Sequence, residues 1–244
     1  MPSIIDNSKG ILTVSEYSKK DILKFFNHIP EEKVFVTPLA ANSNFKPLDK
    51  DYCKNYIKEK FNFNKPYILY IGGFSLRKNA RGLILAFDKI SKDLNEPHIL
   101  LLAGSLKDEG KKLAELAKSL PSNENILFTG FIDDALLPTL YNGAEAFIYP
   151  SFYEGFGLPP LEAMSCMTPV ITSNTTSIPE VTGDSCILID PSNKTELEES
   201  LLNLLNNNNF KKELSKKGYE RSLQFSWRQT AIKTLEAYKE ISKH

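Results

Sequence analysis

From residue 67 onward, short apolar segments alternate with longer amphipathic segments. The apolar segments are too short for buried helices and are expected as strands at 67–71, 98–103, 125–129, 146–149, 169–172 and 186–189. Between and after them, helices are expected at 80–94, 110–120, 136–142 and 195–206, and the asparagines at 206–209 are expected as a loop. Short apolar strands that alternate with helices are typical of a parallel sheet covered on both faces. The sequence therefore predicts an α/β fold with a doubly wound, Rossmann-like parallel sheet.

Glycine and polar residues follow each of the six predicted strands. They are Gly72, Gly73, Gly104, Gly130, Pro150, Ser151, Ser173, Asn174 and Asp190. In a parallel sheet these positions share one edge, and in doubly wound folds ligands bind outside that edge. The sequence therefore places a ligand site at the carboxyl ends of the strands.

The segment 150–164 carries the most distinctive chemistry. Glu154 and Glu162 are separated by seven residues and flank a turn that contains Gly155 and Gly157. Glycines let backbone N–H groups approach a ligand, and the following helix start offers further donors and a partial positive charge. Two interpretations stay open: a turn that holds hydroxyls and phosphates, or a helix start whose acidic residues interact favourably with its dipole.

Two cations follow the glycine pair after the first of these strands. Arg77 and Lys78 lie just before the helix expected from residue 80. Two cations and a helix N-terminus can converge on a pyrophosphate. The alternative is a pair of solvated basic residues beside a capping Asn79.

The motifs, in their order along the chain, closely resemble the donor-binding half of the retaining GT-B glycosyltransferases, family four or "group 1". The matching segments are YIGGFSLRKN at 70–79, GFIDD at 130–134, LPTLY at 137–141, PSFYEGFGLPPLEAM at 150–164, CMTPVITSN at 166–174 and IPEVTGD at 178–184. The resemblance covers nearly the whole chain. It implies the donor-binding half of a GT-B fold.

The resemblance also implies roles for individual residues. Glu154 is expected to face the hydroxyls of a donor sugar and to act in catalysis with Arg77 and Lys78, which contact the phosphates. Glu162 is expected to accept hydrogen bonds from the ribose. Residues 175–177 either complete the wall of the pocket or form a plain turn. The other residues expected to bind the donor are Gly73, Ile132, Asp134, Gly155, Phe156, Gly157 and Leu158.

The implied activity is that of a retaining glycosyltransferase. It would move a hexose, mannose or a similar sugar, from a nucleoside-diphosphate sugar to a glycan or lipid-linked acceptor, with catalysis mainly by positioning and charge stabilisation. The alternative is a nucleotide-sugar-binding module that lacks the acceptor domain and is inactive on its own. No cofactor or metal is expected, because the acidic pair Asp49 and Asp51 lies in a linker where it is better explained as a helix cap.

Three parts of the chain are expected. Residues 1–46 are a remnant strand and helix of an N-terminal domain with a linker, 47–225 form the nucleotide-sugar-binding domain, and 226–244 form a C-terminal crossing helix. Within the first part, residues 34–36 are expected to lead into the linker. The expected partner is an N-terminal acceptor domain or a partner chain. Without it, an apolar strip on residues 10–26 and on Trp227, Ile232, Leu235 and Tyr238 is expected to be exposed and to drive association. A homo-oligomer and peripheral membrane contact stay open.

Composition excludes several other classes of protein. Thirty basic and thirty acidic residues give a formal net charge of zero, which argues against a nucleic-acid partner. Three scattered cysteines favour reduced thiols and a cytoplasmic location. No apolar run reaches the roughly 18 residues that a membrane span needs.

Overall fold

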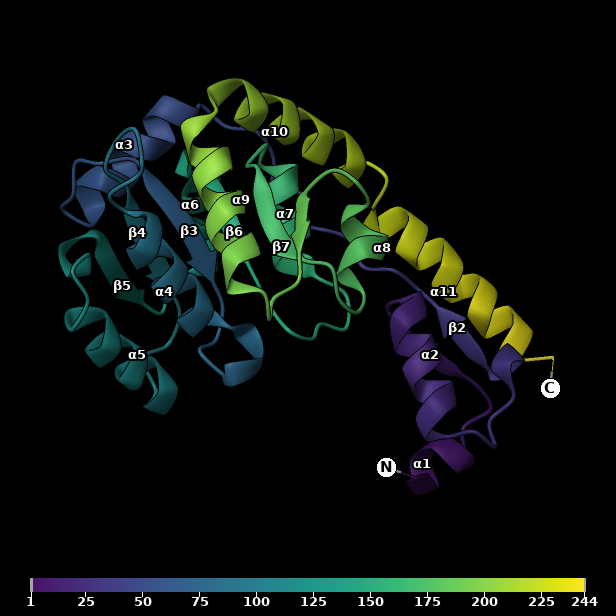
Figure 1. The fold of residues 1–244 in the computed structure, drawn as a ribbon. Coiled ribbons are helices and arrows are strands. Elements are labelled where there is room, and N and C mark those ends of the chain that lie inside the picture. Colours follow the sequence, from purple (N-terminus) through teal and green to yellow (C-terminus); the bar gives the residue numbers. More distant parts are fainter. Residues whose placement is uncertain (1, 244) are drawn as a thin grey trace.

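The computed structural model describes residues 2–243, and its centre is a six-stranded parallel sheet (Figure 1). The strand order is β5-β4-β3-β6-β7-β8, and every neighbouring pair is parallel. The strands are β3 (Tyr67–Ile71), β4 (Ile99–Ala103), β5 (Ile126–Gly130), β6 (Ala146–Tyr149), β7 (Val170–Ser173) and β8 (Ile187–Ile189). All six predicted strands are present, each within one residue of its expected bounds.

Helices cover both faces of this sheet. One group packs together as α4 (Ala80–Ile90), α5 (Asp108–Lys118) and α9 (Lys194–Asn206). The other comprises α3 (Lys50–Lys60), α6 (Leu137–Gly143), α7 (Leu158–Ser165) and α10 (Asn208–Ser222), while the short α8 (Ile178–Thr182) joins β7 to β8. Right-handed crossovers that run outward in both directions from β3 and β6 put these two groups on opposite faces. The predicted doubly wound architecture is confirmed.

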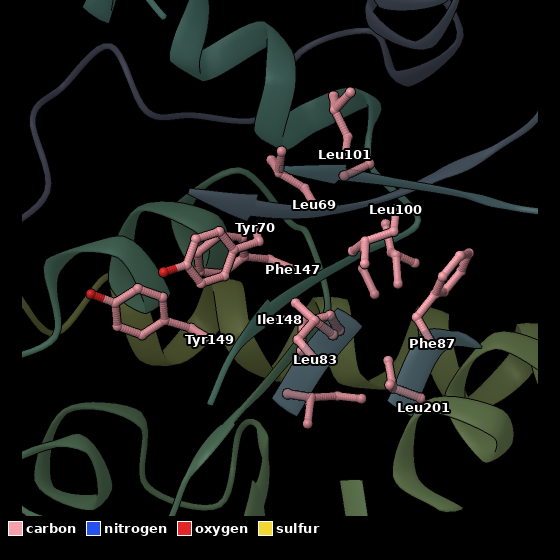
Figure 2. Close-up of a cluster of buried hydrophobic side chains, with 14 of the residues drawn as sticks. Leu69, Tyr70, Leu83, Phe87, Leu100, Leu101, Phe147, Ile148, Tyr149 and Leu201 are labelled. Atoms are coloured by element: carbon pink, nitrogen blue, oxygen red, sulfur yellow. The ribbon is translucent and has the colours of Figure 1, made fainter. Parts of the chain in front are cut away.

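The main core lies on both faces of the sheet, between the strands and the two groups of helices. Figure 2 shows side chains of β3, β4 and β6 packed against α4 and α9, among them Leu100, Phe147, Leu83, Phe87 and Leu201. All five side chains are fully buried, with 0% exposure. Burial of these strands on both faces explains why their sequences are apolar without alternation.

A second, smaller group of elements comes from the two ends of the chain. The two-stranded parallel sheet of β1 (Ile11–Thr13) and β2 (Val34–Val36) lies with α1 (Pro2–Asp6) and α2 (Glu16–Phe25), and α11 (Trp227–Ile241) runs beside β2 (Figure 1). The sequence analysis placed residues 34–36 in the lead-in to a linker, and the structure makes them a strand. Three apolar residues are too few to show a period, so their pairing with β1 decides their structure.

Part of the predicted exposed apolar strip is confirmed. Ile232, Leu235 and Tyr238 of α11 are 47%, 54% and 58% exposed, and Trp227 is 50% exposed. At the end of α2, Phe25 is 74% exposed. Helix α11 is therefore amphipathic, and a large share of its apolar face is in contact with solvent.

The run of asparagines near residue 207 was expected as a loop, and this was wrong. Helix α9 continues through Asn206, and α10 already begins at Asn208. Asn207 alone separates them, and its side chain accepts a hydrogen bond from the Phe210 N–H at 3.0 Å. Asparagine is a favoured N-cap, so the run ends one helix and starts the next.

Four short 3₁₀ turns complete the secondary structure of the described residues, at Glu31–Lys33, Leu76–Lys78, Asn123–Asn125 and Asp134–Leu136. Within residues 2–243, no helix is long and apolar enough to span a membrane. Across the same residues, no group of three or more His, Cys, Asp or Glu side chains is arranged to hold a metal ion. Asp49 caps α3 by accepting from the Tyr52 N–H at 2.8 Å, as the capping interpretation predicted.

An ionic cluster ties three elements together at the amino end of β6. The Glu145 side chain is 12% exposed and faces Lys211 at 3.0 Å, Lys54 at 3.1 Å and Lys50 at 3.7 Å. Burial alone would raise the pKa of Glu145, but the three ammonium groups outweigh it and lower this pKa to about 2. Burial and the two neighbouring lysines lower the pKa of Lys50. The carboxylate therefore holds α3 and α10 to the start of β6.

Replacing Glu145 is expected to destabilise the fold. Glu145→Gln leaves three ammonium groups around a neutral amide, so the free energy of unfolding at pH 7 should fall by about 3 kcal/mol in urea titrations. In the wild type, this contribution is present above the ordinary glutamate pKa and is lost as the pH falls from about 4.5 toward about 2.

The control for this experiment is Glu213→Gln. Glu213 pairs with Lys217 at 2.8 Å on the exposed side of α10, so its replacement should change stability by less than about 0.5 kcal/mol. Equal effects of the two substitutions would contradict the role assigned to Glu145.

Candidate active site

The candidate site lies where the direction of the sheet's crossovers reverses. The connection after β3 leads to β4 on one side, and the connection after β6 leads to β7 on the other. Because β3 and β6 are neighbours, the loops that follow them start side by side at the carboxyl edge. A backbone hydrogen bond of 2.8 Å from the Phe152 N–H to the Arg77 carbonyl joins the two loops. In open α/β sheets, ligands bind at such a switch point.

The structure brings together the three residues predicted as catalytic. Lys78 Nζ lies 2.6 Å from Glu154 Oε1, and Arg77 Nη1 lies 3.4 Å from Glu154 Oε2. Arg77 also donates to the Tyr153 carbonyl. The Lys78 side chain is 15% exposed and that of Arg77 is 47% exposed, so the two are not a pair of equally solvated cations. Burial would raise the pKa of Glu154, but hydrogen bonding to Lys78 and its neighbours holds it below its usual value.

Two tyrosines that the sequence analysis did not single out support this group. Lys78 Nζ contacts the Tyr149 hydroxyl and lies 4.9 Å from the centre of the Tyr149 ring. Tyr70 donates to the Gly73 carbonyl at 2.7 Å. The two rings stack, and Figure 2 shows their hydroxyls pointing to the same side of the cluster. Burial and the nearby Glu154 carboxylate raise the Tyr149 pKa, so this hydroxyl stays protonated. The only sequence signal for these tyrosines was a polar hydroxyl group near the carboxyl end of each buried strand, β3 and β6.

A turn after β7 fixes the backbone around Glu154. Thr176 Oγ1 accepts from the Glu154 N–H at 3.1 Å, and Ser177 Oγ donates to the Glu154 carbonyl at 2.9 Å. Thr175 Oγ1 donates to the Phe152 carbonyl at 3.1 Å. The sequence analysis left open whether these hydroxyls form a pocket wall or a plain turn. Their contacts give them a third role, as supports that hold the site loop in place.

The glycine-rich turn is tightly constrained. Gly157 has a φ of +112°, and a Cβ there would lie 2.7 Å from the Ile178 side chain, so glycine is required on both grounds. The Gly155 carbonyl accepts hydrogen bonds from Ser15 Oγ at 2.7 Å and Ser18 Oγ at 3.1 Å. This carbonyl is therefore already bonded to α2 and its cap.

The start of α7 offers fewer donors than the sequence analysis expected. Pro159 and Pro160 occupy its first turn and carry no backbone N–H. The amides left for a ligand at this point are those of Phe156, Gly157 and Leu158. The Phe156 side chain itself is buried in a small apolar cluster and cannot contact a ligand in the crevice.

Further contacts join α2 to the same loops. Tyr153 donates to Asp21, a bond that, with burial, raises the pKa of this tyrosine to about 12. The Glu16 N–H donates to Glu180 Oε2 at 3.2 Å. The residues before the main sheet thus form one wall of the site.

Glu162 lies in a second polar group, with Tyr141 and Asp134. Tyr141 donates to Glu162 Oε2 at 3.0 Å, and burial together with the nearby Asp134 carboxylate raises the Glu162 pKa to about 7, although the Tyr141 hydrogen bond opposes this. Asp134 is exposed, and no other described residue forms a hydrogen bond or ion pair with its carboxylate. Its neighbour Asp133 is a helix cap that accepts from the Ala135 N–H at 2.8 Å. Of the two aspartates, Asp133 uses one carboxylate oxygen for its cap, whereas both carboxylate oxygens of Asp134 are available to a ligand.

The remaining predicted residues lie at the same edge with different orientations. Gly73 has open space where a Cβ would be, so a ligand can approach its backbone. Ile132 lines a hollow between α3 and the end of β5, and its side chain packs against the main core.

Comparison with known proteins agrees with this geometry. The profile of the family described as "Glycosyl transferases group 1" matches residues 54–221. This chain belongs to the group 1 glycosyl transferases. It is 37% identical over 235 residues to the O-antigen chain mannosyltransferase B of Escherichia coli, covering 96% of this chain and 61% of that protein. The chain thus spans about three fifths of the length of this relative.

Solved structures of other glycosyltransferases share the fold. The sucrose-phosphate synthase of Thermosynechococcus elongatus superposes with a TM-score of 0.81 at 25% identity, covering 99% of this chain and 60% of that chain. A glycosyltransferase from Rickettsia africae gives a TM-score of 0.85 at 22% identity, over 96% of this chain and 64% of that chain. The predicted Rossmann-like fold of the GT-B type is confirmed.

The raised pKa of Glu162 has a consequence for the stability of this glycosyl transferase. Because the folded pKa of about 7 exceeds the ordinary value of 4.5, the group's contribution is full below pH 4.5 and is lost as the pH rises through 7. Glu162→Gln removes the buried charge and should raise the free energy of unfolding at pH 8 by about 2 kcal/mol, with little change at pH 5.

Urea titrations at pH 5 and pH 8 measure this difference. Glu236→Gln, on an exposed position of α11, is the control and should show the same small effect at both pH values. A Glu162→Gln effect that does not depend on pH would contradict the assignment.

Proposed function

We propose that this chain supplies the donor site of a retaining hexosyltransferase. The enzyme would move mannose from GDP-mannose to a glycan or lipid-linked acceptor. The observation that carries the proposal is the meeting of Lys78, Arg77 and Glu154 at the switch point, with distances of 2.6 and 3.4 Å to the carboxylate. Cations held by a carboxylate beside open backbone amides provide groups for both the diphosphate and the sugar hydroxyls of such a donor.

The contacts of Arg77 and Lys78 with Glu154 explain how the site can be charged and still stable in the absence of a ligand. Glu154 neutralises one of the two cations, so the pair of loops keeps one net positive charge. When a diphosphate binds, Arg77, the more exposed cation, is free to turn toward it, while Lys78 stays fixed by Tyr149 and Glu154. Positioning of this kind lowers the reorganisation needed to stabilise a leaving diphosphate.

The choice of guanine rests on Asp134. Guanine presents two adjacent N–H donors on its Watson–Crick edge, which match the two oxygens of a carboxylate, whereas uracil presents one. The exposed Asp134 carboxylate lies close enough to Glu162 to raise the pKa of that residue. A nucleoside with its base at Asp134 and its ribose at Glu162 fits this arrangement. The mannosyltransferase name of the Escherichia coli relative supports mannose as the sugar.

The proposal includes a retaining mechanism, no metal and no cofactor. The leaving phosphate would assist deprotonation of the incoming hydroxyl on the same face of the sugar, with Arg77 and Lys78 stabilising its charge. An acceptor domain, on the N-terminal side or on a partner chain, would complete the crevice against α2. Three buried, unpaired cysteines fit a reducing compartment, so we place the enzyme in the cytoplasm.

A second candidate function is nucleotide-sugar binding without transfer activity of its own. The chain spans 61% of the length of its Escherichia coli relative. Incubation with GDP-[¹⁴C]mannose and a mannan acceptor separates the two functions. Label in the polymer supports transfer, and donor binding without label supports the module.

Calorimetric titration with GDP, UDP and GDP-mannose tests the donor site. GDP should bind in the micromolar range and more tightly than UDP. Lys78→Met and Glu162→Ala should each weaken GDP at least tenfold, or about 1.4 kcal/mol. The first substitution removes a phosphate ligand, and the second removes a ribose acceptor.

Lys118→Met is the matched control, because this lysine is exposed on α5 and pairs with Glu115 at 2.7 Å on its own helix. It should leave the GDP affinity unchanged. Binding of GDP that is indifferent to both site substitutions would show that the crevice has been misassigned.

A further inference from the structure

A hollow of about 620 Å³ lies outside the proposed donor crevice. It is bounded by α3, the carboxyl end of β5 and the turn that leads into α6. Its volume falls within the roughly 300–1,000 Å³ typical of small-molecule sites. Of the residues predicted to bind the donor, Ile132 lines it, and none of those predicted to hold the phosphates or the sugar does.

The segment 133–141 separates this hollow from the donor crevice. Asp133, Leu136 and Thr139 line the hollow. Asp134 and Tyr141 instead interact with Glu162, on the other side of the same segment. In a helical segment these two sets of positions point in different directions. The hollow and the donor crevice therefore share a wall and open to opposite sides of it.

Exposed aromatic rings form much of the hollow's lining. Phe131 is 79% exposed, Tyr52 is 67% exposed and Tyr56 is 41% exposed. The two tyrosines lie one turn apart on α3, with ring centres 6.3 Å apart in a stacked arrangement. These rings are not needed for the core, and aromatic groups gathered in a concave surface mark a binding site.

The polar groups of the hollow favour an uncharged ligand. Among the described residues that line it, Lys60 is the one cation. The Asp133 carboxylate already accepts from the Ala135 N–H. Thr129 and Thr139 supply hydroxyls. A nucleoside diphosphate needs several charged donors, whereas a sugar needs flat apolar faces for its C–H groups and scattered hydrogen-bonding groups for its hydroxyls.

We propose that this hollow is an accessory glycan-binding site, in which hexose units of the acceptor or product chain stack on Tyr52, Tyr56 and Phe131. The inference rests on the proposed transfer of hexose to a glycan. A second contact of this kind holds a polymer near the donor site between transfers and raises its effective concentration there.

The test is titration of the ¹⁵N-labelled full chain with a linear manno-oligosaccharide of four residues, followed by NMR. Amide shifts should concentrate in α3 and in residues 129–139. The double substitution Tyr52→Ala/Tyr56→Ala should raise the dissociation constant at least tenfold. Both tyrosines are on the solvent side of α3 and alanine favours a helix, so the fold should persist. Tyr238→Ala, 58% exposed on α11, is the control and should change the constant less than twofold.

GDP titration of the same samples separates this inference from the proposed donor site. Oligosaccharide binding that depends on the two tyrosines, with GDP affinity unchanged by their removal, supports the accessory site. Three results overturn it: no oligosaccharide binding at millimolar concentration, binding that is equal in the double variant, or loss of GDP affinity in that variant. The last would make the hollow part of the nucleotide site. Failure of GDP to bind any sample counts against the donor site. The accessory site is then tested by whether oligosaccharide binding is lost in the Tyr52→Ala/Tyr56→Ala variant.

Discussion

The parallel pairing of β3 with β6 is the constraint on which the site depends. Lys78 and Glu154 are 76 residues apart in sequence and meet at 2.6 Å because the strands before their loops are neighbours. The same pairing stacks Tyr70 on Tyr149, and each hydroxyl holds a group of the site. A single strand contact thus determines both the packing beneath the crevice and the charges within it.

A buried carboxylate lies at each end of strand β6, and each of the two pairs with cations from other elements, at opposite edges of the sheet. Glu145 precedes it and binds lysines of α3 and α10, whereas Glu154 follows it and binds the cations after β3. A buried charge is costly unless it is paired, so each carboxylate requires its partners to be in place. The first group serves only the fold. The second lies at the carboxyl edge of the sheet, where we propose that the donor binds.

Much of the fold was predictable because it depends on local patterns. The six strands and most helices were expected within a few residues, since fully buried strands and amphipathic helices have distinct periods. The predictions that differed from the structure failed for particular reasons. Strand β2 is three residues long and exists through its pairing with β1, and the asparagine run ends in a cap whose geometry composition cannot reveal. The two prolines at the start of α7 were visible in the sequence, and their missing N–H groups reduce the donors expected there.

The sequence by itself determined the alternation of strands and helices, the edge at which the motif residues lie and the glycines of the site turn, because these follow from periodicity and from what each residue permits its own backbone. Only the tertiary structure decided that Glu154 binds Lys78 and Arg77, that Tyr149 and the hydroxyls of residues 175–177 hold them, and that the α3 aromatics form a hollow behind the crevice. Such contacts join residues that are remote along the chain, and their distances are set by how the sheet and helices pack, which no local pattern encodes.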